Sequence, residues 1–305
     1  MDELLVIANA QAGSEQDERL QAALDVLGEP GAPEVVRCGS PDDVDAALDR
    51  AQGRRIVVAG GDGSVHLIVK RLWERGPDTL AATELGLVPL GTGNDLATGL
   101  ELPQDPADAA RVCLDGTVTA LDLIDSDRGE IVVNASHAGL GAAAAERSDG
   151  LKPSLGPLAY PLGALLAGVR EAAWQLRVTL DGEVVHDGST LMVGIANGPS
   201  IGGGTQLIPR ALPDDGQLDL IVVSAVGPAA RLAFGAALRD AAHLDRDDVL
   251  HARGLEVTVT GDAVTHDLDG ELYDEWPSAS YRVVPAAWRL LTPAGRPGGL
   301  TPRSR

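Results

Sequence analysis

The chain has 305 residues and a formal net charge of −21 at pH 7, with 45 acidic against 24 basic side chains. A chain this acidic is repelled by nucleic-acid phosphates and gains no general attraction to anionic lipids, so we expect no nucleic-acid partner. Its hydrophobic content of 44% suffices for two domains with ordinary cores, and aromatic residues at 3% leave Ala, Val, Leu and Ile to fill them.

The cysteines and the apolar segments predict a cytoplasmic protein. Cys38 and Cys113 lie far apart and form no CxxC pair, which indicates a reducing compartment without thiolate metal sites. The start MDELLVIANA lacks the basic and long apolar parts of a signal peptide. The longest apolar stretch, 155–169, is shorter than the roughly 20 residues of a membrane span and contains two prolines, so we expect no transmembrane segment.

The first 120 residues alternate between strand and helix patterns. Apolar runs predict strands at 4–10, 34–38, 54–60 and 85–91, and the remaining periodic segments predict helices at 14–28, 40–52, 64–75, 94–99 and 105–115. Such alternation favours a parallel sheet covered by helices, in which ligands bind at the carboxyl ends of the strands.

From about residue 121, short strand patterns separated by Asp-Gly turns predict a second, mainly antiparallel β domain. Helical patterns interrupt it near 155–174 and 228–242, and the Gly-, Pro- and Arg-rich tail is expected to be disordered. We place the domains at 1–122, with 286–293 as a candidate segment that returns to it, at 123–285, and the tail at 294–305.

Two glycine-rich loops lie at predicted strand ends. GGDGS (60–64) joins a strand end to a helix start, where backbone N–H groups and the helix dipole suit phosphate, yet it is neither a Walker A loop nor a Rossmann fingerprint. Asp62 beside bound phosphates would be repulsive without a divalent cation, so this loop also predicts Mg²⁺. GTGND (91–95) repeats the arrangement with Asp95, although each loop alone is compatible with an ordinary tight turn.

Three further carboxylates are open to structural and chemical interpretations. Asp122 in ALDL could simply cap a strand end. Asp215, in the PDDG turn of the glycine-rich stretch 196–220, could bind a hard cation or belong to an ordinary Asp-Gly turn. Glu271, just after the hairpin turn in LDGELY, could be a solvent-facing strand residue.

In this order, GGDGS, GTGND, the Asn-Gly…Pro-Asp-Asp-Gly…Leu-Asp run and the late Asp-Gly-Glu resemble the diacylglycerol kinase catalytic family, in its bacterial soluble branch with sphingosine-kinase-like members. The similarity covers residues 4–293. It implies an α/β protein, with a Rossmann-like parallel-sheet nucleotide domain followed by a mainly antiparallel β-sandwich domain and an active site in the cleft between them. GGDG alone is shared with NAD kinases, whereas its combination with PDDG and DGE is more specific.

The resemblance implies ATP and Mg²⁺ as cofactors. It assigns Asp62, Asp95 and Asp122 to the carboxylate network that organises catalytic Mg²⁺, and Glu271 to the general base on the lipid hydroxyl. Asp215, with the carbonyls of Leu212 and Gln217, matches a structural metal site. The nucleotide-binding positions fall on Asn9, Cys38, Gly60, Gly61, Asp62, Gly63, Ser64, Val65, His66, Leu67, Gly91, Thr92, Gly93 and Asn94.

Some positions depart from the family pattern. Ala10 stands in place of the usual Pro after the first Asn, and Cys38 in place of a common Thr. Ser64 replaces Thr but keeps a hydroxyl, and His66-Leu67 replaces Asn-Glu. No carboxylate is lost, so the departures bear on nucleotide affinity and preference rather than on catalysis.

These features predict an ATP-dependent lipid kinase that transfers the γ-phosphoryl group to a diacylglycerol-like or related lipid. A kinase of the same superfamily for a soluble acceptor such as NAD, and a non-catalytic nucleotide-binding regulatory protein, are the alternatives. The lipid would be reached by peripheral contact with the inner face of the membrane, for which 155–169 is the candidate segment, and a buried helix of the second domain is the alternative interpretation of that segment. The oligomeric state is left open, with a homodimer among the options.

Overall fold

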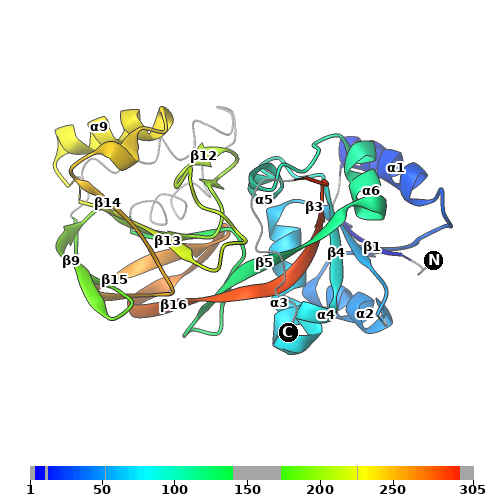
Figure 1. Cartoon of the computed structure of the whole chain (residues 1–305), viewed down its shortest axis with the longest axis horizontal. Helices are drawn as coiled ribbons and strands as arrows, with labels where there is room; N and C mark the ends of the chain where they lie inside the picture. Colours follow the sequence, from blue (N-terminus) through cyan, green and yellow to red (C-terminus); the bar gives the residue numbers. More distant parts are fainter. Residues whose placement is uncertain (1–3, 11–12, 52, 140–172, 225, 296–305) are drawn as a thin grey trace. The chain divides into compact units, whose positions relative to one another are not determined.

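The protein folds into two compact units, residues 1–122 with 285–305, and residues 123–284 (Figure 1). The predicted fold class is confirmed, because the first unit is α/β with parallel strands and the second is mainly antiparallel β. Within the described residues, no helix is both long and apolar enough to cross a membrane. The predicted membrane-contact segment 155–169 and the tail beyond 295 lie outside those residues. The structure, a computed structural model, describes residues 4–10, 13–51, 53–139, 173–224 and 226–295.

A parallel sheet forms the centre of the first unit. β1 and β3 are buried along almost their whole length, which explains their continuous apolar sequences. Because the strands run in one direction, the loops that follow β1, β3 and β4 meet at one edge of the sheet. In spatial order the strands are the end of β16 (Glu271–Thr292), β4 (Glu84–Pro89), β3 (Ile56–Gly60), β1 (Leu5–Asn9) and β2 (Glu34–Cys38).

Helices connect these strands close to the predicted positions. The first helix begins at Ser14 as predicted, with Gly13 as its N-cap, whereas the third helix begins at Asp62 rather than at Ser64. This difference matters, because it places the carboxylate of Asp62 on the first helical turn. The helices are α1 (Ser14–Leu27), α2 (Pro41–Ala51), α3 (Asp62–Glu74), α4 (Pro77–Ala82), α5 (Asp95–Gly99) and α6 (Pro106–Asp115).

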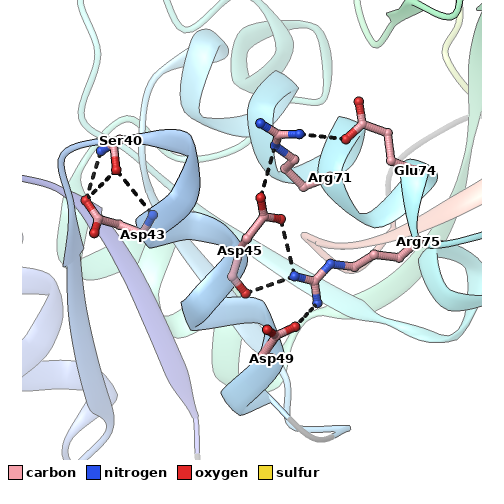
Figure 2. Close-up of polar contacts among 7 residues, drawn as sticks. All are labelled: Ser40, Asp43, Asp45, Asp49, Arg71, Glu74 and Arg75. Atoms are coloured by element: carbon pink, nitrogen blue, oxygen red, sulfur yellow. Dashed lines mark hydrogen bonds and ion pairs between the residues drawn. The ribbon is translucent and has the colours of Figure 1, made fainter.

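An ion-pair network joins α2 to α3 (Figure 2). Arg75 donates to the carbonyl and carboxylate oxygens of Asp45 at 2.9 and 3.2 Å and lies 2.7 Å from Asp49. Arg71 lies 3.6 Å from the other carboxylate oxygen of Asp45 and 2.8 Å from Glu74. Each exposed pair contributes little alone, but Asp45 is shared by two guanidinium groups and so anchors α3, the helix that follows the GGDGS loop.

The second unit is built from antiparallel strands in the order β14-β13-β10-β7-β15-β16, with β8 added to β15 and β9 to β8. β5 (Thr117–Ser126) leads into it and pairs with β6. The predicted helix near 228–242 is α9 (Pro228–Arg239), followed by the short 3₁₀ turn His243–Asp245. The strands are β6 (Ile131–Val132), β7 (Ala135–Gly139), β8 (Trp174–Leu180), β9 (Glu183–Thr190), β10 (Met192–Ala196), β11 (Ser200–Ile201), β12 (Thr205–Gln206), β13 (Leu218–Val223), β14 (Val249–Gly254) and β15 (Glu256–Leu268).

His266 is a titratable side chain in the apolar core of this unit. Its Nδ1 lies 2.7 Å from the Tyr281 hydroxyl, and its ring centroid lies 4.8 Å from that of Trp276. Burial, and to a smaller extent the charge of Arg128, lowers the pKa of His266 from 6.5 to about 4. The folded protein therefore keeps this ring neutral at a pH where an exposed histidine is charged.

We expect His266 to make the folded state sensitive to acid. As the pH falls below 6.5 the unfolded chain protonates this residue, whereas the folded chain does so only near pH 4, so stability is lost across this window. The loss at pH 5 is about 2 kcal/mol. In His266→Gln, which cannot titrate, the free energy of unfolding from urea titrations should fall by about 2 kcal/mol less between pH 7 and pH 5 than in the wild type.

His186→Gln is the matched control for this comparison. His186 is a half-buried histidine on β9 whose Nε2 lies 2.8 Å from the Thr190 hydroxyl. Its replacement controls for a histidine-to-glutamine change on a strand outside the apolar core. If His266→Gln lost stability between pH 7 and pH 5 as steeply as the wild type, His266 would not be the source of the acid sensitivity.

Candidate functional site

The GGDGS loop forms an open helix start at the end of β3. Gly61 is the N-cap of α3, and no side chain caps this helix end. The first N–H groups of a helix have no partner within the helix, and together with the helix dipole they attract anions. A Cβ atom on Gly63 would meet no atom within 4 Å, so the space beside this turn is open. The loop can therefore admit a phosphate group close to its backbone.

The two glycine-rich loops pack backbone against backbone. A Cβ atom on Gly91 would lie 2.7 Å from Gly61 Cα and 2.8 Å from Asn94 Oδ1, so only glycine fits there. The N–H of Leu90 donates to the carbonyl of Gly60 at 2.9 Å and extends the β3–β4 pairing to the loops. The structure thus brings GGDGS and GTGND together at one sheet edge.

Asp62 links the two loops. Its carboxylate oxygens accept the backbone N–H groups of Asp95 at 3.0 Å and of Leu96 at 3.1 Å, at the start of α5. Asn94 has a left-handed backbone with φ of 53°, and its Nδ2 donates to the carbonyl of Gly91 at 2.9 Å. Asp62 and Asp95 are therefore neighbours. The carboxylate of Asp62 has a structural role, because it holds the second loop in place, and this role is separate from any binding of a ligand.

A pocket lies at this edge of the sheet, and we call it the loop pocket. Gln16 on α1 belongs to its lining and donates to the carbonyl of Leu90 at 3.1 Å, and Arg19 donates to the carbonyl of Pro89 at 3.0 Å. The sequence analysis did not predict a role for these two α1 side chains. The only indication in the sequence is that both are polar and lie in the first turns of the helix after β1. The lining residues are Ala8, Asn9, Gln16, Leu20, Ala59, Gly60, Gly61, Ser64 and Leu90.

The loop after β2 is fixed by its own hydrogen bonds (Figure 2). The Asp43 carboxylate accepts the N–H of Gly39 at 2.9 Å, the N–H of Ser40 at 3.0 Å and the Ser40 hydroxyl at 2.9 Å. The Gly39 and Ser40 bonds lower the pKa of Asp43. Cys38 lies opposite Asn9 in the sheet and is buried, and burial raises the pKa of its thiol. This position thus holds a neutral thiol at the sheet edge.

The other predicted nucleotide positions differ in their exposure. Thr92 is exposed and Gly93 half-buried in the second loop, close to Gly91 in sequence. Val65 and His66 are buried on α3, while Leu67 is half-buried. The N–H of Val65 already donates to the carbonyl of Gly61 at 3.2 Å as part of the helix. The N–H of Ser64 donates to the same carbonyl at 3.0 Å, so the backbone of residues 61–63 is the better placed part of this stretch for contact with a ligand.

Asp122 has a structural partner within the first unit. Its Oδ1 accepts the N–H of Ala286 at 2.8 Å, and its carbonyl accepts the indole N–H of Trp288 at 3.0 Å. Ala286 has φ of 52°, so the carboxylate fixes a tight left-handed position where β16 enters this unit. Among the described residues, no three His, Cys, Asp or Glu side chains gather to hold a metal ion, so Asp122 does not join Asp62 and Asp95 in such a set.

The Asp-Gly-Glu turn is anchored in the second unit by its aspartate. Asp269 has a left-handed backbone with φ of 52°, and its carboxylate accepts the N–H groups of Val133, Asn134 and Ala135 at 2.6, 2.9 and 2.9 Å. This role of Asp269 is invisible in the sequence, because its partners lie more than 130 positions away. The turn before Glu271 is thereby fixed.

Glu271 is exposed, and its carboxylate has a neighbouring donor. The Tyr273 hydroxyl lies 3.2 Å from Glu271 Oε2 and 2.7 Å from Glu130 Oε2. Burial, followed by the hydrogen bond with Glu130, raises the pKa of Tyr273, so the phenol stays protonated as a donor. The first strand residues of β16 therefore present an accessible carboxylate of restricted orientation.

The PDDG turn does not fit a structural metal ion. Asp215, the predicted ligand, is ion-paired with the guanidinium of Arg253, and its Oδ1 accepts the N–H of Gln217 at 3.1 Å. A guanidinium therefore binds the one carboxylate that the resemblance assigns to the metal, for which the carbonyls of Leu212 and Gln217 are the other implied ligands.

Known families match both halves of the chain. Residues 3–126 match the diacylglycerol kinase catalytic domain, and residues 134–292 match the YegS C-terminal NAD kinase beta sandwich-like domain. The "Probable lipid kinase YegS-like" protein of Pseudomonas aeruginosa is 33% identical over 309 residues, which cover 96% of this chain and 95% of the relative. The protein of the same name from Stenotrophomonas maltophilia is 32% identical over 79% of this chain and 80% of the relative.

Solved structures agree with this fold. A "putative diacylglycerol kinase" from Bacillus anthracis superposes with a TM-score of 0.80 at 22% identity, over 96% of each chain. An NAD kinase from Archaeoglobus fulgidus in complex with ATP gives a TM-score of 0.52 at 12% identity, over 96% of this chain and 95% of that chain. At these identities the likeness concerns the fold alone. The resemblance inferred from the motifs is confirmed by the family matches: the chain belongs to the YegS-like lipid kinase family, with a diacylglycerol kinase catalytic domain followed by a YegS C-terminal domain.

Proposed function

We propose that the protein transfers the γ-phosphoryl group of ATP, with Mg²⁺, to the hydroxyl group of a lipid. The observation that carries this proposal is the sheet edge that holds the loop pocket and an uncapped helix start, where the carboxylate of Asp62 binds the backbone N–H of Asp95. Such a helix start attracts phosphate oxygens, and the carboxylates call for a cation between them and the phosphates. Relatives named as lipid kinases support a lipid as the acceptor class.

ATP fits the donor groups of this pocket. Residues 61–63 would hold its phosphates through backbone N–H groups, and Ser64, which lines the pocket, would offer its hydroxyl. Within the described part of the chain, the buried Oδ1 of Asn94 accepts no hydrogen bond, so it can receive one from a ligand hydroxyl or a bound water. Asp62 and Asp95 would hold Mg²⁺ together with phosphate oxygens, a combination that this ion commonly uses. When bound, the ion neutralises negative charge on the phosphoryl group.

Glu271 is the proposed general base. Its carboxylate is exposed, follows a turn fixed by Asp269, and lies 3.2 Å from the protonated phenol of Tyr273, which Glu271 shares with Glu130. A carboxylate held in this way can take the proton of the lipid hydroxyl as its oxygen attacks phosphorus. Water must be kept from the same position, because it would compete with the lipid for the phosphoryl group.

The acceptor is proposed to be a diacylglycerol-like lipid at a membrane surface. The likeness to an NAD kinase is one of fold at 12% identity, and it does not favour NAD as an acceptor. With a net charge of −21 the protein gains nothing from anionic headgroups, so the contact with the inner face of the membrane would be peripheral and apolar.

A phosphorylation assay on total lipid extract tests this function. The protein is incubated with the extract in detergent micelles, γ-labelled ATP and Mg²⁺, and products are separated and identified by mass. We expect label in one organic-soluble lipid class and its absence when EDTA is added. Transfer to NAD but to no lipid would support the soluble-acceptor alternative, and ATP binding without any transfer would support a regulatory protein.

A further inference from the structure

The positive charge beside the PDDG turn (213–216) is a side chain of the protein, the guanidinium of Arg253. Arg253 on β14 lies directly opposite Asp219 on β13 in the antiparallel register. Its Nη2 contacts the Asp215 carboxylate, and its Nε lies 3.4 Å from Asp219 Oδ2. One guanidinium therefore bridges the carboxylate of Asp215 within the turn and that of Asp219 on the strand that follows it.

The remaining carboxylate oxygens also have partners. Asp215 Oδ1 accepts the N–H of Gln217 at 3.1 Å. Asp219 Oδ1 lies 2.7 Å from Nε2 of His251, which stands two residues before Arg253 and on the same face of β14. Among the described residues, three of the four oxygens thus contact a backbone N–H, an imidazole or the guanidinium at hydrogen-bond or shorter distance, and the buried Asp219 Oδ2 has only the ion pair with Arg253.

A divalent cation would compete with Arg253 for these oxygens. Mg²⁺ requires a near-octahedral shell of oxygen ligands and gives up its waters reluctantly. The side chain of Asp219 is only 1% exposed, so displacing the guanidinium would remove the cation paired with a buried carboxylate. Breaking such a pair on one side is strongly destabilising. The planar fork of a guanidinium, in contrast, suits two carboxylates at once.

We propose that Arg253 takes the place of the structural metal ion in this chain. The guanidinium holds the PDDG turn against β14, and the turn requires no divalent cation. The motif resemblance correctly indicates that Asp215 binds a cation, but the cation is a side chain that lies 38 positions later. This inference is independent of the proposed kinase activity, because it concerns the stability of the second unit.

Thermal unfolding of the nucleotide-free wild type gives the first test. The unfolding temperature is measured in EDTA and in millimolar Mg²⁺, for the wild type and for Asp215→Asn. We expect the same temperature for the wild type with and without the ion. A rise with Mg²⁺ that Asp215→Asn abolishes would overturn the proposal, and this arm requires no variant of Arg253 to fold.

Arg253→Met gives the second test, since it removes the charge and keeps an apolar stem. We expect its unfolding temperature to fall by about 5–10 °C and to recover in part with Mg²⁺. The recovery should disappear in the double variant with Asp215→Asn. Arg177→Met is the matched control, because Arg177 forms an exposed strand pair with Asp187, and it should shift the temperature by less than about 2 °C without a response to Mg²⁺.

Two results of the second test would overturn the proposal that Arg253 takes the place of a metal ion. One is an Arg253→Met protein as stable as the wild type, because the guanidinium would then hold nothing. The other is a destabilised Arg253→Met protein that gains no stability from Mg²⁺ or Ca²⁺. If Arg253→Met fails to fold, Arg253→Lys serves instead, since its single ammonium should give a smaller loss of stability and a weaker response to Mg²⁺.

Discussion

Replacing Asp62 by asparagine is expected to lower kinase turnover by about 10²–10³-fold while the parallel sheet stays folded. The Asp62 carboxylate accepts two backbone N–H groups of α5 and carries one of the two charges proposed to hold Mg²⁺. An asparagine has only one acceptor oxygen, so its amide group would face one of these N–H groups and repel it. The measurement is kcat with Mg²⁺ and ATP on the lipid extract, beside the circular dichroism of each protein.

Two further variants make this result specific. Asp78→Asn removes an exposed carboxylate from the first turn of α4 and should retain wild-type turnover. Asp95→Asn keeps the backbone N–H that binds Asp62, so it should raise the Mg²⁺ concentration needed for half-maximal turnover without loosening the loops. A folded Asp62→Asn protein with wild-type turnover would remove Asp62 from the mechanism.

The position of the nucleotide loops could be predicted from the sequence, whereas the role of Asp62 within them could not. Uniformly apolar strands alternating with helices require a parallel sheet, and a parallel sheet places the loops after β3 and β4 at one edge. That Asp62 caps α5 depends on the left-handed backbone of Asn94 and on the contact of Gly61 with Gly91. Neither is encoded in hydrophobic periodicity.

The second unit illustrates the same limit. Its Asp-Gly turns are recognisable from local sequence, because they need left-handed backbone positions. The partners of their carboxylates are fixed by strand register, which a single sequence does not reveal. Arg253 lies opposite Asp219 in the register, and the N–H groups of residues 133–135 donate to the carboxylate of Asp269. Family resemblance pointed to Asp215 as a cation ligand, but the ion pair of Asp215 with Arg253 depends on this strand register and could not be predicted from the motif.

We expect Glu271→Gln to reduce kcat by about 10²–10⁴-fold with little change in the affinity for ATP. Glutamine has the same shape and can still accept the hydrogen bond of Tyr273, but it cannot take a proton from the lipid hydroxyl. The nucleotide would be bound by the loop pocket, to which Glu271 contributes no atom. Steady-state kinetics with varied ATP and saturating lipid separate the two effects.

The controls for Glu271→Gln lie on the same strand. Glu275→Gln removes another exposed carboxylate of β16 and should leave kcat unchanged. Tyr273→Phe removes a hydroxyl shared between Glu130 and Glu271, and the loss of its contact with Glu271 should lower kcat by about fivefold. This order of effects follows if Glu271 moves the proton and Tyr273 positions it. Equal losses in Glu271→Gln and Tyr273→Phe would instead mean that the hydrogen-bonded pair shapes the turn, and the proton would then have to leave the lipid by another route.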